Sequence, residues 1–287
     1  SKLGFGVSKT MQVAQKLYEG IEIDGTPVGL ITYMRTDSVR VSDDAQNMAH
    51  DFILQNYGEK YYPEKANIYA KGKQNVQDAH EAIRPSYPER TPDSIKKYLD
   101  NDQYKLYKLI WEKFMSSQMS PAEIANKTIE ISSGDYTLRA GTSKITFDGF
   151  LTLYNDSEDD EEKASDAKIP DLEKGDKVVC KKILPKQHFT QPPPRYNEAS
   201  LVKALEEYGI GRPSTYATII TVIQTRKYVE KKDKALRPTL LGRTVSKQLV
   251  SQFSDIMDYK FTAGMEEKLD KIAEKQAVWV KVLQDFY

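Results

Sequence analysis

The sequence lacks the features that mark several classes of protein. It contains a single cysteine, Cys180, which excludes a disulfide framework and a thiolate metal cage and fits a reducing compartment. No apolar run approaches the ~20 residues needed to cross a bilayer, so no membrane segment is expected. The chain begins at Ser1 without a signal-peptide or transit-peptide pattern. These absences predict a cytoplasmic segment of a longer protein.

A net charge is missing as well. The 42 basic and 42 acidic residues cancel, which argues against a strongly basic nucleic-acid binder. The balance is uneven, because six acids lie in the run DSEDDEE at 156–162 and the rest of the chain carries a formal charge of +6. Such a run is more often a solvated loop than a site for a divalent metal, and we interpret it as a loop.

The 287 residues are too many for one small core, and their patterns divide the chain into three parts. Residues 1–120 are expected to be mainly helical, with VGLITYM at 28–34 as their strand. Residues 121–191 alternate apolar and polar positions, which predicts an antiparallel sheet over 127–190. Residues 192–287 follow a proline-stiffened linker and are expected to be helical again. The predicted fold class is α+β and multidomain.

Local signals mark the ends of the first helices. Ser8 and Ser42 are candidate caps of two helices. A longer helix is expected over 92–119, with a break near Asn101.

The last part has the order of a helix-turn-helix with a wing. Asn197 is the candidate cap of a helix that Gly209 and Gly211 end, and Pro213 suits the first turn of the next helix. A short basic hairpin is expected at 228–242, followed by helices near 242–253 and 261–284.

The stretch GLITYMRTDS at 29–38 contains a candidate nucleophile. In an extended strand, residues two apart point to the same side, so Tyr33 and Arg35 are expected about 7 Å apart in one pocket, with Asp37 beside them. A free phenol has a pKa of about 10 and needs a base or a nearby cation to attack, and Arg35 is a suitable cation and phosphate clamp. Because the chain has 18 tyrosines, the motif alone is weak evidence.

The stretch DAHEAIRPS at 78–86 contains a second candidate cluster. On a helical turn, His80 and Arg84 would share one face and could clamp a phosphate, with His80 donating a hydrogen bond or handling the proton of the leaving oxygen. The alternative, that Asp78 or Glu81 simply satisfies His80 at a helix start, is equally open.

The stretch YGIGRPSTYATII at 208–220 contains a third cluster. Its glycines precede a helix whose first N–H groups, together with Arg212, Ser214 and Thr215, could hold an anion. Arg226 would extend the same phosphate track. A purely structural alternative is that Ser214 or Thr215 only caps the helix.

Five stretches in this order resemble the successive motifs of bacterial type IA DNA topoisomerases: GLITYMRTDS, AHEAIRPS, YNEASLVKALEEYGIGRPSTYATIITVIQTRKYV, LRPTLLG and FTAGMEEKLDKIAE. The resemblance covers nearly the whole chain, and Met34 favours the topoisomerase I branch. It implies that Tyr33 is the nucleophile that forms a 5′-phosphotyrosine link with single-stranded DNA. It also implies that Arg35 stabilises the transition state and that His80 belongs to the active site.

The resemblance implies relaxation of negatively supercoiled DNA by cleavage of one strand, strand passage and religation. No ATP is required, because a phosphotyrosine ester stores the energy of the broken phosphodiester. The residues expected to hold the single strand are Arg212, Thr215 and Arg226, with Ser214 and Arg84 as further contacts.

The chain also departs from the family pattern. The Toprim domain, which carries a catalytic glutamate, a lysine and the acidic residues that bind Mg²⁺, is expected before residue 1, and zinc-binding or basic repeats are expected after residue 287. This chain is therefore expected to bind no metal itself, and to bind single-stranded DNA while cleaving it poorly.

By the same resemblance, residues 1–120 form the tyrosine domain, 121–191 part of a β-rich arch, and 192–287 part of a DNA-binding domain. The protein is expected at the bacterial nucleoid. Two alternatives stay open. A tyrosine recombinase uses similar residues, although its tyrosine usually follows the histidine, and a non-catalytic winged-helix module could be built on 192–287.

Overall fold

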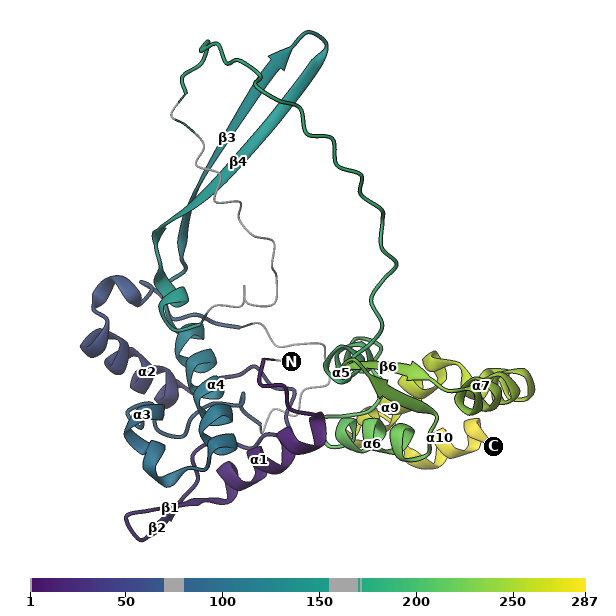
Figure 1. The fold of residues 1–287 in the computed structure, drawn as a ribbon. Coiled ribbons are helices and arrows are strands. Elements are labelled where there is room, and N and C mark those ends of the chain that lie inside the picture. Colours follow the sequence, from purple (N-terminus) through teal and green to yellow (C-terminus); the bar gives the residue numbers. More distant parts are fainter. Residues whose placement is uncertain (1, 70–79, 155–169, 171) are drawn as a thin grey trace. The chain divides into compact units, whose positions relative to one another are not determined.

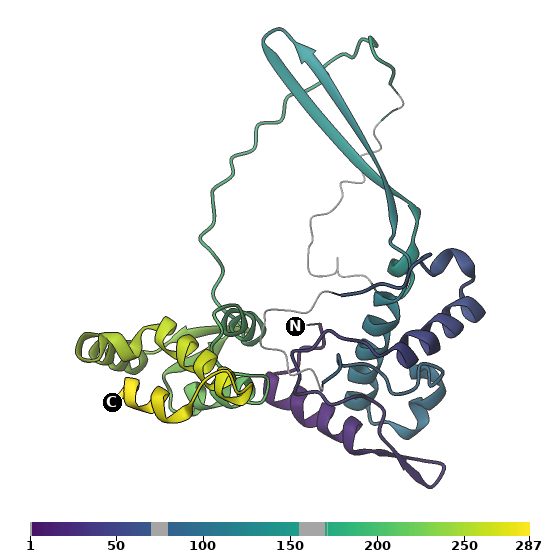
Figure 2. The same cartoon turned by 180° about the vertical axis from the view of Figure 1, so that it is seen from behind.

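The computed structural model describes residues 2–69, 80–154, 170 and 172–287. It combines α-helices with small antiparallel two-stranded sheets, as Figures 1 and 2 show from opposite sides. The predicted mixture of helix and antiparallel strand is therefore confirmed. The acidic run at 156–162 and Asp78 lie outside the described residues.

The α-helices of the described residues are α1 Val7–Glu19, α2 Asp43–Asn56, α3 Pro92–Ile95, α4 Asn101–Ser117, α5 Glu198–Glu207, α6 Tyr216–Thr225, α7 Leu240–Gln252, α8 Ser254–Met257, α9 Tyr259–Ala273 and α10 Trp279–Phe286. The strands are β1 Ile21–Ile23, β2 Thr26–Val28, β3 Glu123–Ser133, β4 Tyr136–Phe147, β5 Val229–Lys232 and β6 Ala235–Pro238, and the short 3-10 helices are η1 Glu59–Tyr61, η2 Lys96–Tyr98 and η3 Gly149–Thr152.

The chain divides into two compact units, each built from separated segments. Unit 1 joins residues 1–48, 68–114 and 194–287, and unit 2 joins 49–67 and 115–193. Fully buried side chains of unit 1 include Leu17, Leu30, Ile31, Tyr107 and Ile220, and those of unit 2 include Ile53, Met115 and Met119. The three-domain division at 120 and 191 stays a prediction.

Helix α1 begins in a way that the sequence did not indicate. Its N-cap is Gly6, without a side-chain cap, so the expected cap at Ser8 is wrong. Instead, the N–H of Val7 donates to the carboxylate of Glu198, at 2.8 Å and 191 residues away. The same carboxylate accepts from Lys231 Nζ at 2.8 Å. The carboxylate of Glu198, which is distant in the sequence, therefore accepts from an N–H group in the first turn of α1, as a local N-cap side chain usually does.

The β1–β2 hairpin was not predicted. Asp24 and Gly25 turn it with positive φ angles of 49° and 80°, the backbone that a tight two-residue hairpin turn requires. An Asp-Gly pair between apolar residues is a recognised signal for such a turn. The strands in this part of the chain are therefore β1 and β2, and they precede the segment 28–34 in which a strand was expected.

Two other expectations about helices are confirmed. Helix α2 follows Ser42, whose Oγ accepts from the N–H of Ala45 at 3.4 Å. The helix expected over 92–119 is interrupted before Asn101, where η2 separates α3 from α4. Thr91 caps α3 by accepting from the N–H of Ser94.

Unit 2 contains one long hairpin, β3–β4, in place of the predicted sheet over 127–190. The stretch 176–186 forms no strand, and η3 interrupts the segment that was expected to continue β4. The cause of the interruption is visible at Gly149, whose φ is 47° and where a Cβ would lie 2.6 Å from the carbonyl oxygens of Ser120 and Pro121. The chain turns there instead of extending.

The base of this hairpin is pinned by hydrogen bonds. Asp148 accepts from the hydroxyl of Thr152 at 2.6 Å and from that of Tyr61 at 2.8 Å, and these bonds lower its pKa. The N–H of Ser120 donates to the carbonyl of Tyr61 at 2.8 Å, and the N–H of Phe150 donates to that of Ser120 at 3.0 Å. Both ends of the hairpin are therefore tied to the same point.

The last part of unit 1 follows its prediction more closely. Asn197 and Ser200 form a capping box at the start of α5, and Gly209 and Gly211, with φ of 69° and 77°, turn the chain towards α6. Helix α6 begins after Thr215, slightly later than the expected start at Pro213. The order helix, turn, helix, hairpin is confirmed (Figure 1).

The hairpin β5–β6 joins α7 through a tight junction. Thr239 accepts from the N–H of Gly242 and donates through its hydroxyl to the carbonyl of Lys227 at 2.7 Å. A Cβ on Gly242 would lie 2.0 Å from the carbonyl oxygen of Tyr228. The LRPTLLG motif thus has a structural use, because only glycine permits this approach.

Candidate functional site

The segment that carries Tyr33 is extended, but it is not the predicted strand. Its only bridge among the described residues joins Ile31 to Pro85, and the chain bends at Met34 and Arg35. The N–H of Leu30 donates to the carbonyl of Leu17, at the end of α1, at 2.8 Å. The segment is therefore held between the end of α1 and the residues around Pro85. Because the chain bends at Met34, the alternation of sides expected in a strand does not continue to Arg35.

The residues around Pro85 belong to the segment that carries His80. The N–H of Thr32 donates to the carbonyl of Arg84, and that of Ser86 donates to the carbonyl of Leu30, each at 2.9 Å. Residues 80–86 form no helix, so the shared helical face predicted for His80 and Arg84 is wrong. Backbone groups that would form hydrogen bonds within a helix instead form them between the Tyr33 segment and the His80 segment.

This pairing brings two of the predicted catalytic residues together. The ring centroids of Tyr33 and His80 lie 5.7 Å apart, and Tyr18 packs on Tyr33 edge to face at 5.4 Å. Tyr33 and His80 are both partly exposed, so the phenol stands in an aromatic setting with access to solvent.

Arg35 and Asp37, which follow Tyr33, are both exposed. Burial raises the pKa of Tyr216, the charges of Glu206 and Asp37 raise it further, and Arg212 acts in the opposite direction. The Tyr33 segment and the third cluster both belong to unit 1, which includes residues 1–48 and 194–287.

The Arg84 side chain is turned inward. Its guanidinium pairs with Glu81 at 2.7 and 2.8 Å and donates to the carbonyl of Pro85 at 3.0 Å. Only 12% of the Arg84 side chain is exposed. These contacts hold the 81–85 loop, and they leave little of the guanidinium for a phosphate.

Arg212 is also engaged within the protein. Its guanidinium meets Asp270 at 2.5 Å and Glu266 at 3.7 Å, both on helix α9. The hydroxyl of Thr215 accepts from the N–H of Arg212 and donates to its carbonyl, which closes the turn locally. Ser214 and Thr215 are exposed at the start of α6.

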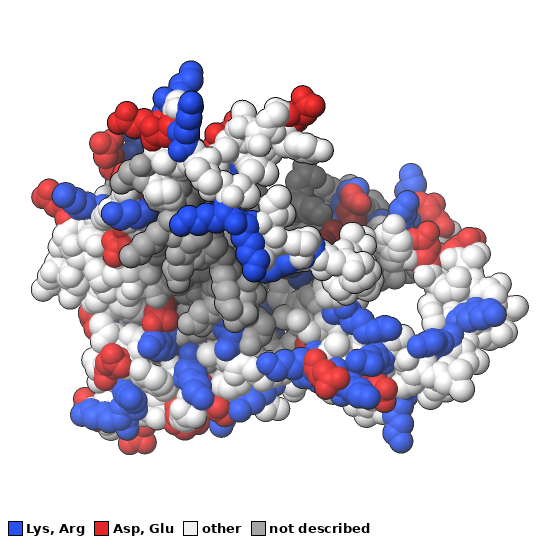
Figure 3. Space-filling model, turned by 45° about the horizontal axis from the view of Figure 1, so that its top comes forward, with Lys and Arg blue, Asp and Glu red and all other residues white. Residues whose placement is uncertain are grey.

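Arg226 differs from the other two arginines. It is exposed at the end of α6, and no ion pair joins it to any of the described residues. On the face that Figure 3 shows, basic and acidic side chains are interspersed. A nucleic acid bound there would meet both signs of charge.

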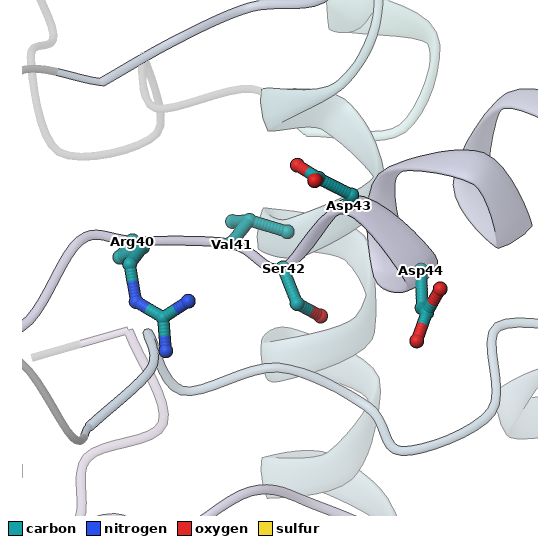
Figure 4. A pocket seen from close by; sticks show the side chains of 5 residues that line it. All are labelled: Arg40, Val41, Ser42, Asp43 and Asp44. Atoms are coloured by element: carbon teal, nitrogen blue, oxygen red, sulfur yellow. The ribbon is translucent and has the colours of Figure 1, made fainter.

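A hollow of about 430 Å³ lies at the start of α2, lined by Arg40, Val41, Ser42, Asp43 and Asp44. In Figure 4 the side chains of Arg40, Ser42 and Asp44 point to one side of the segment and that of Asp43 to the other. The hollow adjoins the 80–86 segment, because the carbonyl of Arg40 accepts from the N–H of Ala82 at 2.8 Å. None of the predicted catalytic residues lines it.

The described residues contain no group of three or more His, Cys, Asp or Glu side chains that could hold a metal ion. None of the described helices is both long and apolar enough to cross a membrane.

The family model for DNA topoisomerase matches residues 1–284. The chain belongs to this family, on its bacterial type IA branch, which confirms the resemblance of its motifs. It is similar to the solved structure of full-length topoisomerase I from Thermotoga maritima in a monoclinic crystal form, with 36% identity and a TM-score of 0.80. The match covers 100% of this chain and 46% of the Thermotoga maritima chain, so this chain spans less than half of that relative.

Sequence reasoning missed the residues that hold the clusters in place. Thr32, Glu198 and Asp270 each bind a group 50 or more residues away. No pattern of neighbouring residues marks such partners. Thr32, Glu198 and Asp270 all lie inside the five motifs, which is the signal that could have directed attention to them.

Proposed function

We propose that this chain supplies the tyrosine side of the active site of a bacterial type IA DNA topoisomerase, an isomerase that relaxes negatively supercoiled DNA without ATP. The observation that carries the proposal is the placement of the Tyr33 phenol against the His80 imidazole, with ring centroids 5.7 Å apart. Two motifs that are 47 positions apart in the sequence meet there at a partly exposed surface.

In the proposed reaction, the oxygen of Tyr33 attacks the phosphorus of a single-stranded phosphodiester. An O–P bond to tyrosine forms, the bond from phosphorus to the 3′ oxygen breaks, and the strand is left with a 5′-phosphotyrosine and a 3′-hydroxyl. The phenol proton passes to water, which can reach the partly exposed Tyr33, and the 3′ oxygen gains a proton. His80 is suited to donate a hydrogen bond to the phosphate or to supply the proton to the 3′ oxygen. Arg35 would stabilise the charge on the non-bridging oxygens. Religation is the same sequence in reverse.

The single strand is proposed to lie along the start and end of α6. Ser214, Thr215 and Arg226 are exposed there, which supports the assignment. Arg212 would act from within its carboxylate pair, and Arg84 would act mainly by holding its loop.

The proposal also assigns the metal to another part of the protein. The described residues offer no cluster of His, Cys, Asp or Glu side chains that fits Mg²⁺. We propose that a Toprim domain joined to this chain holds Mg²⁺, which would supply charge stabilisation at the phosphate, and that the protein acts on DNA at the nucleoid.

The test is a covalent adduct. A labelled single-stranded oligonucleotide is incubated with Mg²⁺ and with this chain, either alone or fused to a Toprim domain of the family, and adducts that resist denaturation are separated. The fused chain is expected to form a 5′-linked adduct that Tyr33→Phe abolishes, and the chain alone to form at least ten-fold less. An adduct that persists in Tyr33→Phe contradicts the assignment, and a 3′ linkage would support a recombinase-like reaction instead.

A non-catalytic DNA-binding role is the second candidate. The confirmed order α5, turn, α6, hairpin favours it, because this is the layout of a winged helix. It predicts sequence-specific binding to duplex DNA, and a preference for single strands at fixed ionic strength would argue against it.

A further inference from the structure

The position of the Tyr33 phenol depends on its backbone. The ring packs between Tyr18 and His80, and among the described residues no hydrogen bond to its hydroxyl group is present. Ring packing alone is not directional enough to fix one oxygen atom. The backbone next to Tyr33 therefore has to set where the phenol points.

Thr32, the residue before Tyr33, binds the segment of His80 through both its backbone and its side chain. Its N–H donates to the carbonyl of Arg84 at 2.9 Å. Its Oγ1 accepts from the N–H of Arg84 at 2.9 Å and donates to the carbonyl of Ala82 at 2.7 Å. One hydroxyl thus satisfies a donor and an acceptor of the facing backbone.

These bonds fall next to the two rings. The Thr32 to Ala82 bond lies one residue from Tyr33 and two residues from His80. Ala82 is held from its other side as well, since its N–H donates to the carbonyl of Arg40 at 2.8 Å. Both backbone polar groups of Ala82 are therefore bonded to residues that flank Tyr33, namely Thr32 and Arg40.

The hydroxyl matters because the pairing is so short. In a regular sheet, a ladder of backbone bonds sets the register of every residue. Here the ladder consists of the bonds between 30–32 and 84–86, and the bend at Met34 ends it. The two hydrogen bonds of the Thr32 side chain therefore fix the register that a longer ladder of backbone hydrogen bonds would otherwise fix.

We infer that Thr32 is a positioning residue of this site, and that its hydroxyl sets the placement of the Tyr33 phenol relative to the His80 imidazole. The inference rests on the proposed function, since it concerns the same reaction. Thr32 touches neither DNA nor the reacting atoms in this role, and it acts through the two segments that it joins.

The informative variants are Thr32→Val, which keeps the shape and removes the hydroxyl, and Thr32→Ser, which keeps the hydroxyl. A misplacement of about 1 Å can cost about 100-fold in rate, so Thr32→Val in the Toprim fusion is expected to form adduct about 100-fold more slowly. Its affinity for a single-stranded oligonucleotide is expected to stay within about two-fold, because no DNA contact is removed. Thr32→Ser should recover the rate to within about three-fold.

A matched control is Thr137→Val, at an exposed position of β4. It makes the same chemical change away from the site and should leave the adduct rate and the DNA affinity unchanged. A slower rate in this control would mean that the loss of any threonine hydroxyl is enough, which would overturn the inference.

The geometry can be measured without the reaction. In this chain with ¹³C-labelled tyrosine and histidine, nuclear Overhauser contacts between the rings of Tyr33 and His80 are expected in the unaltered protein and in Thr32→Ser, and are expected to weaken in Thr32→Val. A folded Thr32→Val that keeps either the full adduct rate or the full ring contact overturns the inference. If the unaltered fusion forms no adduct, the proposed function fails, while the ring contact still decides the role of Thr32.

A measurement on the unaltered chain covers the case in which Thr32→Val does not fold. The N–H of Arg84 has the hydroxyl of Thr32 as its acceptor, so its hydrogen exchange should be slowed at least ten-fold relative to an exposed amide. Exchange at the exposed rate would show that this bond is not made and would overturn the inference.

Discussion

The Tyr33 segment and the Arg212 turn lie in the same compact unit, but different kinds of contact hold them. The Tyr33 segment is held mainly by backbone bonds to residues about 50 positions away, with one side-chain hydroxyl added. The Arg212 turn is closed by Thr215, three residues away, and by two glycines, and it is then tied to α9. A substitution in the Tyr33 segment should therefore lower reactivity more than stability. A substitution around the Arg212 turn should lower stability more than reactivity.

The largest effect on stability is expected at Gly242, which lies in α7 against the backbone of Tyr228. In Gly242→Ala the new Cβ would lie 2.0 Å from the carbonyl oxygen of Tyr228, so α7 has to move away from the start of β5. Overpacking of this kind costs about 3 kcal/mol, measured by denaturant unfolding. The matched control is Gly264→Ala on α9, where the Cβ meets nothing within 4 Å. That control should be neutral or stabilising by up to about 1 kcal/mol, and equal losses in both variants would refute the steric explanation.

A smaller effect is expected at Glu198, which links the start of α1 to the β5–β6 hairpin. Burial acts to raise its pKa, but the bonds from Lys231 and from the N–H of Val7 outweigh burial and lower the pKa below its ordinary value of 4.5. Because the folded pKa is the lower one, the carboxylate stabilises the fold above pH 4.5, and this contribution is lost as the pH falls through the folded pKa.

Glu198→Ala is therefore expected to cost about 2 kcal/mol near neutral pH, and much less near pH 3. Unfolding by urea at the two pH values measures the difference. Glu207→Ala, on the same helix at an exposed pair with Lys203, should cost less than about 0.5 kcal/mol at both. A cost for Glu198→Ala that is the same at both pH values would contradict the electrostatic account.

The smallest effects on stability are expected for substitutions of Arg212 and Arg226. Arg212 has two carboxylate partners and Arg226 is exposed without an ion pair to any described residue, so their losses should differ in kind. Arg212→Gln is expected to lower stability by about 1 kcal/mol as well as weaken the binding of single-stranded DNA. Arg226→Gln should weaken that binding a few-fold, reduce its salt dependence by about one phosphate contact and leave stability unchanged. A stability loss in Arg226→Gln alone would reverse the comparison.

The same contrast explains which parts of the fold could be predicted. The Asn197 cap, the glycine turn before α6 and the β5–β6 hairpin depend on residues within a few positions of one another, so their patterns are readable in the sequence. The strand expected at 28–34 and the helical turn expected to join His80 to Arg84 were wrong, because residues 30–32 and 84–86 take their hydrogen bonds from each other. A local pattern does not contain that partner.

The candidate site was predicted in its residues and less well in its geometry. Motif resemblance selected Tyr33 and His80, and their ring centroids lie 5.7 Å apart, while the placement of Arg35 beside Tyr33 stays a prediction, because the chain bends at Met34 and Arg35. Arg84 and Arg212 were selected as phosphate contacts, and both have acidic partners: Glu81 lies three residues from Arg84, whereas Asp270 lies 58 residues from Arg212 and could not be identified by spacing.

The pinned base of the β3–β4 hairpin has a mechanical consequence. Strand β3 has 11 residues, which at about 3.4 Å per residue makes an arm of roughly 35 Å. A rotation of about 10° at Gly149 and Asp148 would carry the tip of such an arm by about 6 Å. Because the hydrogen bonds around Tyr61 and Ser120 fix the base of the hairpin, a change in them would displace its tip more than its base.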